Sequence, residues 1–225
     1  MRVDIKFCGM TQRADAQHAV SLGARYVGVI FAGGPRMLTV DQAHDVFRDI
    51  PRAVHRVGVF AEQSSRDIAR IAERLGLDVV QLHSSATPAR IKELRGDFPG
   101  DIWPVVRVVD GELPIGFSEL LEAADAVLLD AFSPLALGGT GVALPWRALS
   151  DDLRQRRGDT PIILAGGLTP DNVSRAIGDL APNVVDVSSG VESAPGIKDH
   201  QRMRAFRDAV TGASRFDIST TTSPK

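Results

Sequence analysis

Residues 161–178 read PIILAGGLTPDNVSRAIG: an apolar run, then two glycines, then a stretch with helical spacing. The run PIIL is short and rich in branched residues, so it predicts a buried strand. The pair Thr169 and Pro170 predicts a helix start, because threonine caps helix N-termini and proline is favoured at the first helical position. This one stretch therefore predicts a complete strand–turn–helix unit.

The same unit recurs along the whole chain. Strands are expected at residues 3–8, 25–31, 55–60, 78–83, 102–108, 126–131, 161–167 and 184–190. Helices are expected at residues 14–23, 39–50, 64–76, 87–96, 169–178 and 197–210. Strands this apolar are typical of parallel sheets covered on both faces. The repeat predicts an α/β fold, a single-domain (βα)8 TIM barrel with a parallel eight-stranded sheet over residues 1–210.

A doubly wound open sheet is the alternative fold. A dinucleotide-binding version of it is weakened because no Gly-x-Gly-x-x-Gly motif follows the first strand. The C-terminal residues 211–225 are polar and lack periodicity, so we expect a disordered tail there.

Composition excludes several classes of partner. Of the 225 residues 44% are hydrophobic and 24% charged, which is ordinary for a soluble domain. One cysteine allows no internal disulfide, and the first residues lack the apolar run of a signal peptide, so a cytoplasmic location is expected. No apolar stretch approaches the ~20 residues of a membrane span. The net charge of −2 is spread evenly, and the basic segment RQRRGD suits a solvated helix end, so neither nucleic acid nor membrane is an expected partner.

The single cysteine ends the first predicted strand, in IKFCGMT (residues 5–11). Active sites of such barrels lie at the carboxyl ends of the strands. Lys6 and Cys8 share one face of the strand, so a buried ammonium could lower the thiol pKa from its ordinary value of about 8.5. The resulting thiolate would be a base or a nucleophile. A small buried hydrophobic side chain is the alternative role for Cys8.

Asp186 shares a face of the eighth strand with Ser188. Strands one and eight are neighbours in a closed barrel, so Lys6 and Asp186 are expected to meet inside it. Such a pair would satisfy two charges that are rarely buried alone. A purely structural ion pair remains an equal alternative to a functional one.

Asp130 follows the apolar AVLL at the end of strand six. Desolvation favours the neutral form of such a carboxyl, which suits a general acid. A thiolate base at Cys8 and an acid at Asp130 could face each other across the barrel mouth and move protons on a sugar phosphate. A helix cap or turn former is the alternative role for Asp130.

Glycine-rich turns follow strands seven and eight, where barrels often bind phosphate. Glycine lets the backbone approach a ligand closely, and a helix start favours anions. The candidate phosphate residues are Gly166, Gly167, Ser188, Ser189 and Gly190. Two ordinary glycine-rich turns are the alternative.

Two further features remain open. The glycines of LGGTGVALPW, which are Gly138, Gly139 and Gly141, suggest a mobile loop that closes over a ligand, or one without function. His83 lies at a strand end, either lining the pocket or serving the structure. The other histidines, His18, His44, His55 and His200, are expected to be structural or exposed.

Several of these segments occur in one known family. KFCGMT, GARYVGVIFAGGPRMLT, GLDVVQLH, GGTG, PIILAGGLTPDNV and VDVSSGVESAPGIKD follow one another in its order, from Lys6 to about Phe206. The chain resembles the phosphoribosylanthranilate isomerases of tryptophan biosynthesis. The resemblance implies a (βα)8 barrel and an Amadori rearrangement by an aldose–ketose isomerase. No nicotinamide, metal or other cofactor is expected, because the reaction has no net redox change.

The resemblance also implies residue roles. Cys8 would be the general base and Asp130 the general acid, while Arg36 would bind the anthranilate carboxylate. The phosphate would lie on Gly166, Gly167, Ser188, Ser189 and Gly190, and we count His83 and Asp186 among the substrate-binding residues. The expected partner is the small-molecule substrate, with the protein a monomer or a homodimer.

The chain departs from the family pattern at Gly34, Ser84, Val142 and Pro145. These departures put in doubt the contacts of the loop after strand six and the affinity or speed of the enzyme. Two rival functions therefore stay open: another sugar-phosphate isomerase or lyase barrel, and a non-catalytic sensor of a phosphorylated ligand.

Overall fold

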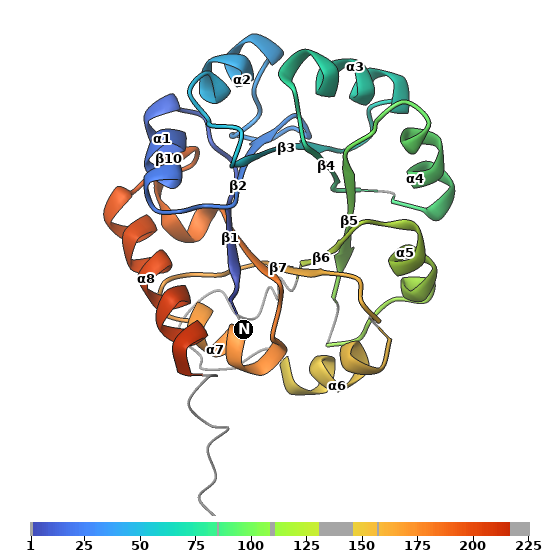
Figure 1. The fold of residues 1–225 in the computed structure, drawn as a ribbon, viewed down its shortest axis with the longest axis vertical. Coiled ribbons are helices and arrows are strands. Elements are labelled where there is room, and N and C mark those ends of the chain that lie inside the picture. The colour runs from blue at the N-terminus through green and yellow to red at the C-terminus, as the bar shows by residue number, and fades with distance from the viewer. Residues whose placement is uncertain (1, 85, 109–110, 131–145, 157, 217–225) are drawn as a thin grey trace, which may run out of the picture.

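The computed structural model describes residues 2–84, 86–108, 111–130, 146–156 and 158–216. Eight parallel strands pair in chain order and close into a barrel, and a ring of helices surrounds it (Figure 1). The first strand pairs with the second and the eighth, which closes the sheet. The predicted (βα)8 barrel is confirmed, and the doubly wound open sheet is wrong.

Each strand overlaps a predicted one. The strands are β1 (Asp4–Phe7), β2 (Tyr26–Ile30), β3 (His55–Phe60), β4 (Val79–Leu82), β5 (Asp101–Arg107), β6 (Val127–Asp130), β7 (Ile162–Ala165) and β8 (Val184–Val187). Their apolar runs had to be buried on both faces, and the barrel buries one face inward and the other beneath the helices.

The helices form the outer ring. They are α1 (Arg13–Ser21), α2 (Val40–Phe47), α3 (Ser65–Leu75), α4 (Pro88–Arg95), α5 (Phe117–Ala123), α6 (Trp146–Arg156), α7 (Val173–Leu180) and α8 (His200–Phe216). Threonines cap α2 and α4, since the side chains of Thr39 and Thr87 accept backbone N–H groups of the first turns. The predicted helices did not include α5 and α6. Among the described residues, no helix is both long and apolar enough to span a membrane.

Three predicted helix boundaries are wrong. Residues 197–198, expected to begin the last helix, form a short strand, and the helix begins at His200. The helix after β7 begins at Val173, not beside Thr169, because Asn172 closes a turn first by accepting the Thr169 N–H at 2.8 Å. At the C-terminus α8 continues to Phe216, so residues 211–216 are helical and not a disordered tail. The rest of that predicted tail, residues 217–225, lies outside the described residues.

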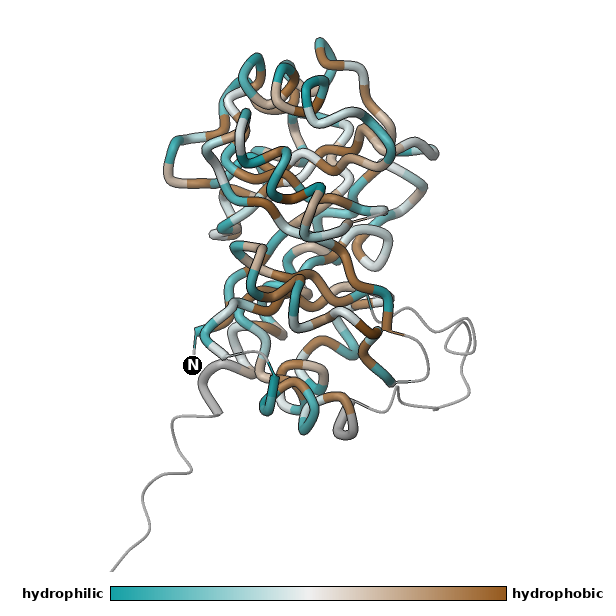
Figure 2. The backbone as a smooth tube through the Cα atoms, turned by 90° about the vertical axis from the view of Figure 1, so that its right-hand side faces the viewer, coloured by the Kyte–Doolittle hydropathy of each residue, from teal (hydrophilic) through white to brown (hydrophobic). Residues whose placement is uncertain are grey.

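Apolar side chains pack in two layers. The larger lies between the barrel and the helices, and the smaller fills the barrel interior with Val57, Val79, Trp103, Ala126, Leu128, Ile163, Ala165 and Val184. Along β8, Val185 and Val187 belong to the outer layer, whereas Val184 points inward. Hydrophobic and hydrophilic segments are interspersed along the backbone (Figure 2).

A short excursion follows β8. The chain forms a 3-10 turn, η2 (Ser189–Val191), and then an antiparallel hairpin of β9 (Glu192–Ala194) and β10 (Ile197–Lys198). The backbone N–H of Lys198 donates to the buried Asp15 carboxylate of α1 at 3.0 Å, which fixes the hairpin beside the first βα unit.

Candidate functional site

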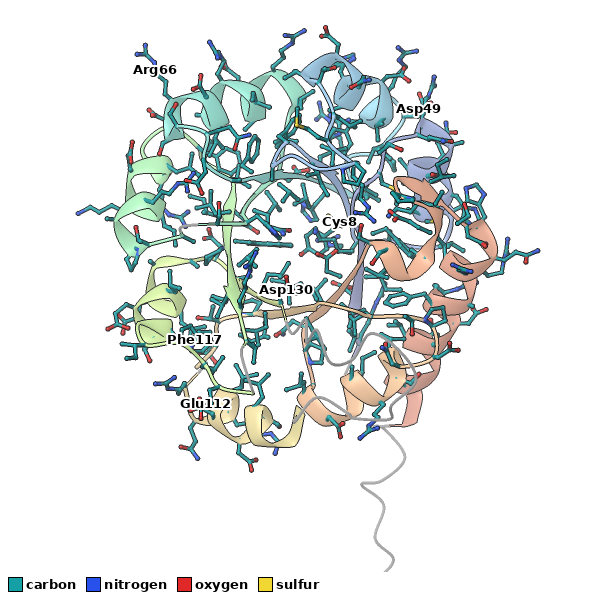
Figure 3. The ribbon with its side chains drawn as sticks, turned by 180° about the vertical axis from the view of Figure 1, so that it is seen from behind. Cys8, Asp49, Arg66, Glu112, Phe117 and Asp130 are labelled. Carbon is teal, nitrogen blue, oxygen red and sulfur yellow. The ribbon has the colours of Figure 1, made fainter. Side chains whose placement is uncertain are left out.

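A cavity of about 370 Å³ lies at the carboxyl ends of the strands. Its lining contains every site residue that the sequence predicted: Cys8, Arg36, His83, Asp130, Gly166, Gly167, Asp186, Ser188, Ser189 and Gly190. Figure 3 shows Cys8 and Asp130 within the ring of strands, while Asp49 and Arg66 lie outside on the helical shell. Strands far apart in the sequence thus bring these residues together.

A buried ion pair lies at the cavity floor. Lys6 and Asp186 are paired in the register of β1 and β8, and Lys6 Nζ lies 2.7 Å from Asp186 Oδ2. The ammonium also donates to Gln81 Oε1 of β4 at 2.9 Å. Burial favours the neutral amine, but Asp186 and Cys8 together outweigh it and hold the pKa of Lys6 above its ordinary value. The predicted meeting of Lys6 and Asp186 is confirmed.

Cys8 follows β1 directly and is 6% exposed. A Cβ added at Gly28 of β2 would lie 3.0 Å from its Sγ and 3.4 Å from Lys6 Cε, so Gly28 leaves room for both side chains. Burial raises the pKa of the Cys8 thiol, and the charge of Lys6 opposes that rise. Lys6 therefore acts in the predicted direction, but the expected net lowering of the thiol pKa is wrong, because desolvation outweighs it.

Asp130 ends β6 and is only partly buried. Its backbone carbonyl accepts the Val108 N–H at 3.1 Å, which fixes the strand end, while its side chain lines the cavity. Asp130 and Cys8 thus approach one cavity from β6 and β1. The loop that follows Asp130, with Gly138, Gly139 and Gly141, lies outside the described residues, as do Val142 and Pro145.

The two glycine-rich turns pack against each other. A Cβ added at Gly190 would lie only 1.9 Å from the Leu168 carbonyl oxygen, so only glycine permits this contact. Gly166 and Gly167 have positive φ angles of 92° and 63°. Asn172 donates its side-chain N–H to the Gly167 carbonyl at 2.9 Å and so braces the first turn.

Arg36 has a partner that the sequence did not predict. Its Nε and Nη2 donate to Glu192 of β9 at 2.8 and 2.6 Å, and Lys198 of β10 donates to the same carboxylate at 2.8 Å. Burial favours the neutral acid, but the hydrogen bonds from Arg36 and Lys198 hold the pKa of Glu192 below its ordinary value. Glu192 and Lys198 both lie in the segment VESAPGIKD, which is part of the family resemblance. No rule of sequence spacing connects that segment to Arg36.

Gly9 lets the side chains of Arg36 and Ser188 pack closely against the turn after β1. Its φ angle is +68°, and a Cβ there would lie 2.7 Å from both Arg36 Cδ and Ser188 Oγ. A side chain at this position would be strained and would push the arginine stem away from the Cys8 turn. The Cys-Gly pair after β1 therefore provides both the thiol and the space for Arg36.

The remaining predicted positions have defined surroundings. His83 lines the cavity, and its Nδ1 is buried without a hydrogen-bond partner among the described residues. At the departures from the family pattern, Gly34 has a positive φ of 82° and Ser84 donates to Glu62 at 2.7 Å. The other histidines lie off the cavity; His18 and His200, for example, stack with ring centroids 4.0 Å apart. In the part of the chain that the structure describes, no group of three His, Cys, Asp or Glu side chains could hold a metal ion.

A closed barrel of eight parallel strands, with polar side chains converging at their carboxyl ends, defines the class of (βα)8 barrel enzymes. The family model described as N-(5'-phosphoribosyl)anthranilate (PRA) isomerase matches residues 5–209. The chain belongs to this family.

Individual relatives agree with this assignment. The N-(5'-phosphoribosyl)anthranilate isomerase of Paracoccus denitrificans is 40% identical over 210 residues, which cover 92% of this chain and 96% of that protein. The crystal structure of phosphoribosyl anthranilate isomerase from Thermotoga maritima superposes with a TM-score of 0.82 at 32% identity, covering 93% and 99% of the two chains. A crystal structure of such an isomerase with reduced 1-(o-carboxyphenylamino)-1-deoxyribulose 5-phosphate gives a TM-score of 0.79 at 31% identity over the same shares.

Proposed function

We propose that this chain isomerises N-(5-phosphoribosyl)anthranilate to 1-(2-carboxyphenylamino)-1-deoxyribulose 5-phosphate in tryptophan biosynthesis. Membership of the isomerase family supports the reaction. The observation that carries the assignment of residues is one cavity that holds a thiol, a carboxyl group, an arginine and two glycine-rich turns. These are the groups that proton transfer on a phosphorylated sugar with an aromatic carboxylate requires.

Asp130 begins the reaction as general acid. It gives a proton to the ribose ring oxygen, the bond from C1 to that oxygen breaks, and the nitrogen lone pair forms an iminium with C1. Asp130 suits this step because its side chain reaches the cavity from the end of β6.

Cys8 continues as general base. Its thiolate removes the proton at C2, whose acidity the iminium raises, and the electron pair moves to give the enolamine. The enolamine then takes a proton at C1 from the Cys8 thiol and loses its C2 hydroxyl proton, which restores Asp130. Two protons enter the substrate and two leave it, so the product is an isomer and both residues return to their starting states.

The rest of the cavity binds and orients the substrate. Arg36 binds the anthranilate carboxylate through its planar guanidinium. The amides of Gly166, Gly167 and Gly190, with the hydroxyls of Ser188 and Ser189, bind the phosphate. Asp186 Oδ1 is buried without a hydrogen-bond partner among the described residues, and His83 Nδ1 is in the same state, so both suit the ribose hydroxyls.

The test is to supply the purified chain with phosphoribosylanthranilate and to identify the product by NMR. Appearance of the C1 methylene and the C2 ketone supports the function. Turnover of a ribosylaminoimidazole aldose but not of the anthranilate substrate would favour the other sugar-phosphate barrel. Binding of the substrate without conversion would favour a sensor.

The cytoplasmic location also stays a prediction, and so does the choice between monomer and homodimer. Size-exclusion chromatography with light scattering measures the second directly.

A further inference from the structure

Arg36 reaches the cavity from a fixed support. Glu192 holds the guanidinium at Nε and Nη2, and its own side chain is 4% exposed, whereas that of Arg36 is 22% exposed. The cavity lining includes Arg36 but neither Glu192 nor Lys198. The carboxylate therefore lies behind the arginine, on the side away from the cavity.

This support leaves donors free for a ligand. A guanidinium carries five N–H groups, and Glu192 takes one from Nε and one from Nη2. Among the described residues, none accepts a hydrogen bond from Nη1 of Arg36. One N–H on each Nη nitrogen thus remains at the far end of the fork, and this pair has the spacing that a second carboxylate accepts.

Lys198 determines the net charge of the group formed by Arg36, Glu192 and Lys198. Its side chain is fully buried and lies 2.8 Å from Glu192 Oε1. Arg36 and Glu192 alone would be neutral, so a ligand carboxylate would gain little from approaching them. With Lys198 the three groups keep one net positive charge, close to the free end of the fork.

The same ammonium reaches the other end of the site. Lys198 Nζ donates to the Ser188 carbonyl at 3.1 Å and lies 3.5 Å from Ser188 Oγ. Ser188 belongs to the turn after β8 that lines the cavity. One buried lysine therefore contacts both the support of Arg36 and the candidate phosphate turn.

We propose that Glu192 and Lys198 are positioning residues that aim Arg36 at the ligand carboxylate and keep its surroundings positively charged. Glu192 fixes the direction of the Arg36 guanidinium. Lys198 offsets the negative charge of Glu192, so that the surroundings of Arg36 stay positively charged. This inference rests on the proposed function, in which Arg36 binds the carboxylate of the substrate.

The experiment compares two ligands by calorimetry. One is the reduced 1-(o-carboxyphenylamino)-1-deoxyribulose 5-phosphate, and the other is the same molecule without the ring carboxylate. The ratio of their dissociation constants measures the carboxylate preference of each variant. Glu192→Asp keeps the charge but shortens the reach, so it should lower this preference about tenfold while the carboxylate-free ligand binds as before. Lys198→Met should also lower the preference about tenfold.

Three controls make the outcome decisive. Lys92→Met removes the same charge at an exposed position on α4 and should leave the preference unchanged. Lys198→Arg keeps the charge and should retain most of the preference, which covers the case in which Lys198→Met does not fold. In an Arg36→Met background, Glu192→Asp should have no further effect on the preference.

Contrary results are distinguishable. Equal weakening of both ligands by Glu192→Asp would make Glu192 a purely structural residue and would overturn the inference. An unchanged preference in folded Lys198→Met, or a lost one in Lys198→Arg, would overturn the role of its charge. If Arg36→Met itself keeps the preference, then the proposed binding role of Arg36 fails before Glu192 is considered.

Discussion

Lys6 and Asp186 form an ion pair inside the barrel, with Lys6 Nζ 2.7 Å from Asp186 Oδ2 and the lysine fully buried. They are 180 residues apart in sequence, yet adjacent in register, because β1 and β8 close the barrel. Cys8 lies on the same face of the chain as Lys6, two residues further along, and lines the cavity. The charges of the pair thus lie directly below the thiol that we propose as the base.

Lys6→Met tests how strongly the fold depends on this pair. Removing one partner leaves a buried carboxylate without its counter-charge, which costs about 3–5 kcal/mol. We expect a fall of that size in the free energy of unfolding, measured by urea denaturation. The double variant Lys6→Met, Asp186→Leu removes both charges and should recover most of the loss. Equal destabilisation of single and double variants would mean that packing, and not the charge, is responsible.

The pH dependence of activity tests Cys8 as base. Because burial raises the thiol pKa, the thiolate is a minor species at neutral pH and its fraction grows as the pH rises. The mechanism also needs Asp130 protonated, so kcat/KM alone does not isolate the base. We expect the ratio of kcat/KM in the wild type to kcat/KM in Cys8→Asp to increase by up to about tenfold per pH unit between roughly pH 7 and 9.

Cys8→Asp is the matched control for this profile. A carboxyl titrates ordinarily near about 3.9, so the base of this variant should be ionised throughout that range, while both enzymes share the same need for the acid. A ratio that does not change between roughly pH 7 and 9 would contradict the thiol base.

Gly190→Ala tests the packing of the two glycine-rich turns. The new Cβ would lie 1.9 Å from the Leu168 carbonyl oxygen, so the turns must separate. We expect a loss of stability of about 1–3 kcal/mol, together with about tenfold weaker binding of inorganic phosphate, measured by calorimetry.

Gly178→Ala provides the comparison for that substitution. Gly178 lies within α7, and a Cβ there would meet nothing within 4 Å. This variant should be stabilised by up to about 1 kcal/mol and should bind phosphate as the wild type does. Unchanged phosphate affinity in Gly190→Ala would place the phosphate elsewhere in the cavity.

The strands could be predicted from their short apolar runs, and the buried ion pair from the alternation of side chains between the two faces of a strand. Ile5 and Phe7 alternate with Lys6, and Val185 and Val187 alternate with Asp186, so the inward positions of β1 and β8 follow from the apolar pattern. Chain order then placed the two strands side by side. No distant contact had to be known beforehand.

Other features depend on contacts that local patterns do not encode. Thr169 and Pro170 are residue types that favour a helix start. Asn172 instead stabilises a turn there, and the helix begins after it. The direction of the Cys8 pKa depends on the balance of burial against the Lys6 charge, and only the structure gives the burial. Glu192 meets Arg36 across 156 residues through the β9–β10 hairpin, whose geometry no periodicity predicts.

The most direct test of the proposed mechanism is the single-turnover rate of phosphoribosylanthranilate conversion, followed by loss of substrate fluorescence, in the wild type, Cys8→Ser and Asp130→Asn. A general acid or base contributes typically ~10² to 10⁴ in rate, so both folded variants should slow by factors in that range. An active wild type with an equally fast Cys8→Ser would contradict the thiol base and return Cys8 to a packing role. An equally fast Asp130→Asn would contradict the carboxyl acid in the same way.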